Sequence, residues 1–251
     1  ELDVIDVDAE DKDGDTAFVK GVKKDGRSSV PALSALLAVS SSDEPLTLSQ
    51  WHSLQGAIDI SLLVHICVRY PRYYFDGTTP QDWDGYTTPL HCACYQLVSG
   101  SFAMPDDDVP AYEKGLLRLL DIVPPWFVAV KNNVGWTPIH MAVVNRNATA
   151  VKTLLSLPGG SEAANEVAPG IPYSTPLEAA VRENNVEMAK LLVSQVPDLL
   201  AIPTSEGGTF AQLLDSLGSR VQRLPHLGVR PRYNLWADMR SVVTRPAKSA
   251  A

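Results

Sequence analysis

The chain has 251 residues, of which 45% are hydrophobic and 20% are charged, a composition typical of a folded protein that argues against wholesale disorder. Its longest apolar run lies within residues 28–42 and is broken by a proline and several serines, so the sequence predicts no transmembrane helix. The net charge is −8, but residues 220–251 contain seven basic residues against the single acidic Asp238. An acidic body of net charge −14 is therefore followed by a basic tail of net charge +6.

The three cysteines do not indicate a secreted disulfide framework. Cys92 and Cys94 are too close in sequence for an ordinary disulfide, which leaves Cys67 without an obvious partner. We therefore expect an intracellular, reducing compartment, either the cytosol or an organelle interior. Because the chain opens at Glu1 and not at Met, we expect a processed product, as after removal of a presequence, or an excerpt of a longer chain.

Two stretches near the N-terminus predict degenerate helix pairs. In "DGDTAFVKGVKKDG", Gly14, Thr16 and Phe18 stand where clearer copies further along the chain have their start signals, and Leu36 with Leu37 could close the pair. In "EPLTLSQWHSLQGAIDISLLVHICVRYP", residues 45–46 start one helix and residues 62–63 lie inside the other.

The clearer copies share a Thr-Pro pair. It occurs at residues 88–89, 137–138 and 175–176, and a weaker Thr-Phe version follows at 209–210, so the steps are 49, 38 and 34 residues. Threonine at the cap and proline in the first turn favour a helix start, since the hydroxyl accepts from a free amide and proline lacks one. A polar break and apolar residues ending in a Leu pair follow. Each copy therefore predicts two short helices, separated by surface insertions at 98–110 and 159–172.

These copies resemble ankyrin repeats, in which Gly-x-Thr-Pro-Leu-His-x-Ala-Ala precedes a second helix with a Leu pair. Gly135, Thr137, Pro138, His140 and Ala142 match in one copy, the copy at 85–93 matches likewise, and a glutamate replaces the histidine at position 178. The resemblance covers residues 85–192. It implies an all-α solenoid of about five ankyrin-like repeats over 1–217, with short β-hairpin-like fingers, two degenerate first repeats and a partial cap at 209–217. We expect residues 218–251 to form an irregular, extended tail rich in Arg, Pro and aromatic residues.

The cluster His91, Cys92 and Cys94 offers three plausible zinc ligands, which His65 and Cys67 would join only if the fold brought them close. A structural zinc site usually needs four ligands, and the sequence has no CxxC pair. The resemblance implies instead that the histidine bonds within the turn before its helix and helps hold the next repeat. We therefore expect no metal, no cofactor and no catalysis, with a metal-dependent enzyme as the remote alternative.

The resemblance also implies which residues face a protein partner and which maintain the repeat. The expected partner-binding residues on the concave face and fingers are Tyr86, Cys92, Tyr95, Gln96, Trp136, Met141, Val144, Asn145, Ser174, Arg182 and Glu183. For Tyr86 and Trp136, packing between adjacent fingers is the alternative. The expected structural motif consists of Thr88, Pro89, His91, Thr137, Pro138, His140, Thr175 and Pro176.

Arginine and aromatic residues alternate in the tail, a pattern that favours docking on a protein partner through Arg230, Arg232, Tyr233, Trp236 and Arg240. Packing on the chain's own body and binding of nucleic acid are the alternatives, and the acidic body disfavours the second because it repels phosphate. The sequence thus predicts a structural or accessory subunit that binds other protein subunits, with no indication of a homo-oligomer. A free-standing adaptor and a regulatory region of a larger protein are the competing hypotheses.

Overall fold

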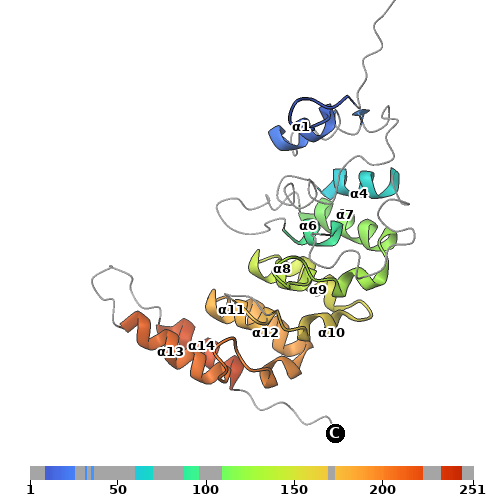
Figure 1. Cartoon of the computed structure of the whole chain (residues 1–251). Helices are drawn as coiled ribbons and strands as arrows, with labels where there is room; N and C mark the ends of the chain where they lie inside the picture. Colours follow the sequence, from blue (N-terminus) through green and yellow to red (C-terminus); the bar gives the residue numbers. More distant parts are fainter. Residues whose placement is uncertain are drawn as a thin grey trace, which may run out of the picture.

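A computed structural model of the chain describes residues 9–25, 32, 35–36, 60–69, 88–95, 109–168, 173–222 and 233–244. Over these residues the protein consists of helices and turns, with no β-strand, and the helices are stacked along one direction from α1 to α14 (Figure 1). The all-α solenoid is therefore confirmed. The expected β-hairpin-like fingers are tight turns, each closed by backbone hydrogen bonds such as Asn132 N–H to Trp136 O at 2.9 Å.

The first helices of the repeats form one column. Each begins directly after a threonine, as the Thr-Pro pairs predict, and consecutive helices pack on one another. They are α6 (Pro89–Tyr95), α8 (Pro138–Val144), α11 (Pro176–Arg182) and α13 (Phe210–Gln222).

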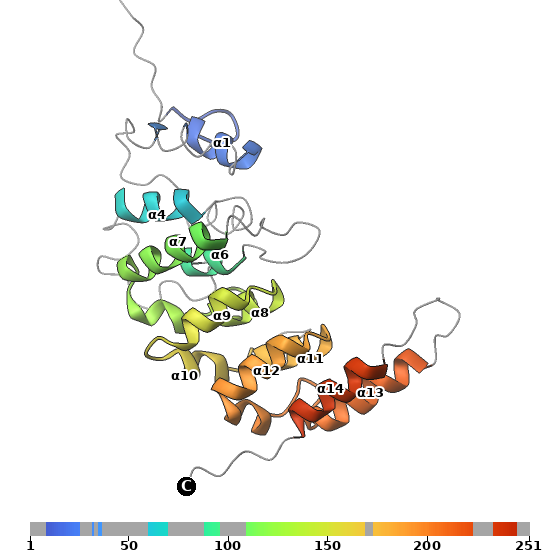
Figure 2. The same ribbon diagram turned by 180° about the vertical axis from the view of Figure 1, so that it is seen from behind.

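The second helices form a parallel column, and the repeats follow one another as antiparallel pairs when seen from behind (Figure 2). Each contacts the next along the stack. They are α4 (Ile60–Arg69), α7 (Val109–Ile122), α9 (Ala148–Leu155), α12 (Val186–Gln195) and α14 (Tyr233–Val243). Asn147 and Asn185 cap α9 and α12 with their side chains, which accounts for the polar breaks in the sequence.

Short helical turns after the second helices form a third column. These are η3 (Pro125–Ala129), α10 (Gly160–Asn165) and η4 (Pro197–Ala201), and α10 contacts both of the others. Phe127, Ala163 and Leu199 are completely buried there. The insertion that we expected at 159–172 therefore contains an ordered helix, because its two alanines fill the place taken by larger apolar residues in the flanking turns.

The N-terminal degenerate repeat is genuine in its first helix, α1 (Ala17–Asp25). Asp11 Oδ1 accepts hydrogen bonds from the amides two and four residues later at 2.8 and 3.0 Å, as Asn132 Oδ1 does at 3.1 and 3.0 Å. Gly14 and Gly135 follow with φ of 74° and 82°, a left-handed conformation that favours glycine. The finger before α1 is therefore the same turn as the finger before α8.

In the second degenerate repeat, Leu62 and Leu63 lie in α4 and are completely buried, as predicted. The expected helix start at Pro45 and Leu46 lies outside the described residues. Helix α4 packs on α7 so closely that a Cβ on Gly115 would lie 2.8 Å from Ile60 Cγ1, and the Ile60 side chain would have to shift to accept it.

The tail differs from the irregular segment that we expected from residue 218. Helix α13 continues to Gln222, and α14 packs on α12 and α13 with Met239, Val242 and Val243 buried. The spacing of these three residues gives α14 one apolar face, which the surrounding arginines and prolines obscured in the sequence. Over these residues the tail folds on the chain's own body and completes the terminal repeat.

Candidate interaction surface

Histidine at the third position of a first helix joins one repeat to the next. The Thr88 amide donates to His91 Nδ1 at 3.2 Å, so the ring proton lies on Nε2. Nε2 lies 2.8 Å from the backbone oxygen of Trp136 and donates to it. Trp136 belongs to the finger of the next repeat. His91 therefore bonds within its own turn and holds the finger of the next repeat.

His140 occupies the same place in the next repeat, where its Nδ1 accepts from the Thr137 amide at 3.3 Å. Its Nε2 is buried and makes no hydrogen bond of normal geometry. Burial dominates and lowers the pKa of His140 to about 3 and that of His91 to about 4. Both rings are therefore neutral near pH 7, and neither is poised for proton transfer there.

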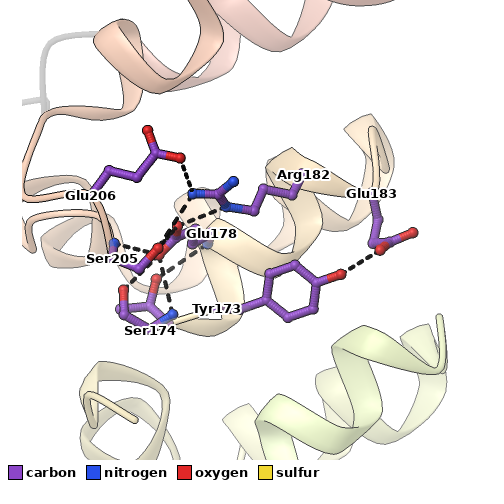
Figure 3. A network of polar contacts seen from close by, with 8 residues as sticks. Tyr173, Ser174, Glu178, Arg182, Glu183, Ser205 and Glu206 are labelled. Carbon is purple, nitrogen blue, oxygen red and sulfur yellow. Dashed lines mark hydrogen bonds and ion pairs between the residues drawn. The ribbon is translucent and has the colours of Figure 1, made fainter. Parts of the chain in front are cut away.

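Glu178 replaces the histidine in the third copy and makes a denser junction (Figure 3). Its completely buried carboxylate accepts from the amide and hydroxyl of Ser174 at 3.1 and 2.6 Å. From the following finger, the amide and hydroxyl of Ser205 donate to it at 2.8 and 2.5 Å. The Arg182 guanidinium donates at 2.8 Å and also pairs with Glu206 at 3.0 Å. The glutamate thus performs the same inter-repeat role with a charged group.

The pKa of Glu178 follows from this environment. Burial raises it, but the hydrogen bonds from Ser174, Ser205 and Arg182 outweigh burial and hold the pKa below its usual value. The carboxylate is therefore ionised and saturated with donors, which makes it a structural group and not an available ligand.

A second buried connection lies among the helices. Tyr112 on α7 donates its hydroxyl to Ala93 O on α6 at 3.0 Å and accepts from Asn147 Nδ2 at 2.7 Å. Because Asn147 caps α9, one tyrosine hydroxyl links three helices of two repeats.

The proposed zinc ligands are not available in this fold. Both ring nitrogens of His91 are engaged, and Cys67, Cys92 and Cys94 are free thiols with no exposed surface. Burial raises the pKa of each thiol, so all three stay protonated. Within the part of the chain that the structure describes, no group of three or more His, Cys, Asp or Glu side chains could hold a metal ion.

The side chains that take no part in the repeat junctions lie on the fingers and on the turns that join the first and second helix of a repeat. Trp136 and Tyr173, from adjacent fingers, are stacked with centroids 6.3 Å apart and planes at 22°. The Tyr173 hydroxyl donates to Glu183 Oε1 at 2.5 Å, and Arg146 lies 3.8 Å from Glu183 Oε2. Val134 and Val167, exposed by 43% and 48%, flank these residues in the chain. We call Val134, Trp136, Arg146, Val167, Tyr173 and Glu183 the finger surface.

The structure sorts the partner-binding residues expected from the sequence. Cys92, Met141, Asn145 and Ser174 are buried in the chain itself, so they are not surface residues and this part of the expectation is corrected. Cys92 and Met141 are buried because they lie on α6 and α8, which pack on one another. Ser174 is buried because its hydroxyl donates to Glu178. Tyr95, Trp136, Val144 and Arg182 are partly exposed and Glu183 is exposed, whereas Tyr86 and Gln96 lie outside the described residues.

The ring of Trp136 packs on that of Tyr173 in the adjacent finger, which is the alternative that we gave for Trp136. Tyr173, Arg146 and the two valines were missed by sequence reasoning. Arg146 carried a signal in the sequence, because it stands in the polar break at 145–147, and the structure gives it a left-handed φ of 58°. In the tail, Arg230 and Arg232 lie outside the described residues, Tyr233 and Trp236 lie on α14, and exposed Arg240 pairs with Asp215 of α13. The described helices include none long and apolar enough to span a bilayer.

Comparison with known proteins agrees with this geometry. Residues 111–201 match the family model of ankyrin repeats in three copies. Among solved structures, the chain is similar to the ankyrin repeat domain of Bcl-3, described as a unique member of the IkappaB protein family. The identity is 22%, the match covers 72% of each chain and the TM-score is 0.41. Comparison with curated proteins gives no match. Residues 111–201 therefore match ankyrin repeats, and the Thr-Pro caps and paired helices described there have the arrangement of such repeats.

Proposed function

We propose that this chain is a non-catalytic structural or accessory subunit that binds other proteins of a larger assembly through the finger surface. Ankyrin repeats are generally protein–protein interaction modules, and the fold itself assigns no chemistry. The observation that carries the proposal is that the side chains of the repeat motif and those of the finger surface lie in different places. In the three Thr-Pro copies the threonine, the proline and the third-position residue are buried, while the finger surface presents aromatic, charged and aliphatic groups to solvent.

The composition of the finger surface fits a protein partner. Aromatic and arginine side chains are enriched where binding energy is concentrated, and exposed valines beside them offer apolar area that would be buried on docking. The tail adds a second proposed contact. In the sequence, Arg230 and Arg232 stand between α13 and α14.

A resident subunit and a free-standing adaptor differ in the set of proteins that remain bound to the native protein. Cross-linking followed by mass spectrometry of the native protein is expected to give constant partners in a stable large complex. Partners that vary between preparations and dissociate on dilution would favour the adaptor. We further propose a reducing compartment, which the three free and buried thiols support, and which cell fractionation would test.

The finger surface is tested by Val134→Ser combined with Val167→Ser, which removes exposed apolar groups without touching a repeat junction. Leu117→Ser is the matched control, because Leu117 is 56% exposed and lies on α7, in the column of second helices and away from the fingers. The double variant should lose the partner cross-links at unchanged thermal stability, whereas the control should keep them. Equal cross-linking by both variants would contradict the proposal.

The tail contact needs substitutions and not a deletion, because removal of residues 219–251 would strip α14 from the array. Arg230→Gln with Arg232→Gln is expected to weaken the same partner cross-links. If the double variant instead releases co-purifying RNA and leaves the protein cross-links intact, the tail binds nucleic acid and its role as a protein contact is wrong.

A further inference from the structure

Two aromatic rings and a carboxylate meet on the finger surface in an arrangement suited to a cation. Trp136 and Tyr173 stack across adjacent fingers and are both partly exposed. The negative face of an aromatic ring attracts a cation, most strongly for tryptophan, and a flat guanidinium also stacks on it. The finger turns hold these two rings in place before any partner arrives, which lowers the entropy cost of binding.

Glu183 supplies the counter-charge beside the rings. Its Oε1 accepts the Tyr173 hydroxyl at 2.5 Å, which fixes the carboxylate against the aromatic pair. Burial and this hydrogen bond raise the pKa of Tyr173 to about 12, so the phenol stays a donor. Its Oε2 meets Arg146 only at 3.8 Å, which is longer than a hydrogen bond, and the side chain is 43% exposed. Glu183 therefore keeps acceptor capacity that buried Glu178 does not have.

The position of Arg146 indicates that a guanidinium group fits beside Glu183. It is an exposed guanidinium of this chain, it stands next to Glu183, and it makes only a loose ion pair. The body of the chain, residues 1–219, has a net charge of −14, so a basic partner segment is attracted to it from a distance. A partner arginine could displace Arg146 from Glu183 Oε2 and use both the rings and the carboxylate.

We propose that Trp136, Tyr173 and Glu183 form a recognition site for an arginine side chain presented by a partner protein. This inference rests on the proposed function and names the partner chemistry of the same surface. The guanidinium stacks on the exposed part of the aromatic pair and donates to Glu183. Arginine is favoured over lysine because a planar, forked donor satisfies the carboxylate and the ring face together.

The test uses acetyl-arginine-methylamide as the probe and its citrulline analogue, which has the same shape without the charge. The readout is the indole N–H resonance of Trp136 in the intact protein, assigned with Trp136→Phe, and the indole of Trp126 on η3 serves as an internal control. The arginine probe should shift the Trp136 signal saturably and leave Trp126 unchanged, and the citrulline probe should bind about tenfold more weakly.

Three variants sharpen the result. Glu183→Gln should weaken the arginine probe about tenfold, while Glu187→Gln, which alters an exposed glutamate of α12, should leave it unchanged. Arg146→Gln should tighten the probe, since it removes the internal competitor. Equal binding of arginine and citrulline, full binding to Glu183→Gln, or no Trp136 shift at about 50 mM probe would overturn the proposal. Partner cross-links that survive in Glu183→Gln would leave the proposed function standing while the arginine site fails.

Discussion

The two buried histidines predict how the stability of the array depends on pH. His91 and His140 have folded-state pKa values of about 4 and about 3, against 6.5 for an ordinary histidine. A depressed pKa means that the unfolded chain binds protons more readily than the folded one. Stability is therefore complete above pH 6.5 and is lost as the pH falls toward the folded-state values.

The size of the effect follows from these pKa values. At pH 5 each histidine removes about 2 kcal/mol of folding free energy relative to pH 8, so the pair removes about 4 kcal/mol. That is a large part of the total stability of an ordinary domain, about 5–15 kcal/mol. Glu178 adds its own loss only at lower pH, because its pKa lies below the usual value in the folded state.

The assay is urea unfolding at pH 8, 6 and 5, comparing the wild type with a His91→Gln and His140→Gln double variant. Glutamine is chosen because Gln212 already stands at the third position of α13 and accepts from the Thr209 amide at 2.8 Å. The double variant should lose stability at pH 8 but show a nearly flat profile down to pH 5. If the wild type and the double variant lose the same free energy between pH 8 and pH 5, the histidines are not buried and neutral as the structure describes.

Three further changes test the packing and the junctions. Gly115→Ala normally favours a helix, but here it should destabilise by about 1–3 kcal/mol in urea unfolding, and a double-mutant cycle should show a smaller cost for Gly115→Ala when Ile60→Ala is already present; a stabilised single variant would refute the close α4–α7 contact. Glu178→Gln should cost about 3 kcal/mol by thermal or urea unfolding because a neutral amide replaces the buried carboxylate that accepts from Ser174, Ser205 and Arg182, whereas Glu187→Gln should cost almost nothing, and equal losses would contradict the network. Tyr112→Phe should cost about 1–3 kcal/mol, measured in the same way, since it breaks the hydroxyl link among α6, α7 and α9, and an unchanged midpoint would show that the link does not form.

Much of the fold was predictable because the residues that determine where each first helix begins are adjacent in the sequence. A threonine followed by proline fixes where a helix begins, and the three Thr-Pro copies each gave a first helix that starts at the proline. Helix α14 was missed because its apolar face is only a few residues long and lies among arginines and prolines. Its stability comes from packing on α12 and α13, which no local pattern records.

The interaction surface was less predictable, because exposure depends on neighbours in other repeats. Met141 and Asn145 were expected on the concave face from their positions in the motif, but both are buried, and Asn145 Nδ2 donates to Met141 O at 2.8 Å. Tyr173 was overlooked because it stands at the glycine position of the motif, two residues before Thr175, where this copy departs from the pattern. Its partner Trp136 was recognised as variable, yet the contact between the two needs the geometry of adjacent fingers.

The junction between His91 and the next finger ends on a backbone oxygen, that of Trp136, and not on its side chain. Any residue at that position carries the same carbonyl, so the side chain can be exchanged while the junction survives. An exchange of the Trp136 ring therefore alters the contact with Tyr173 but leaves this hydrogen bond between the repeats in place. Recognition and architecture use different atoms of one residue, and the specificity of such an array can change faster than its fold.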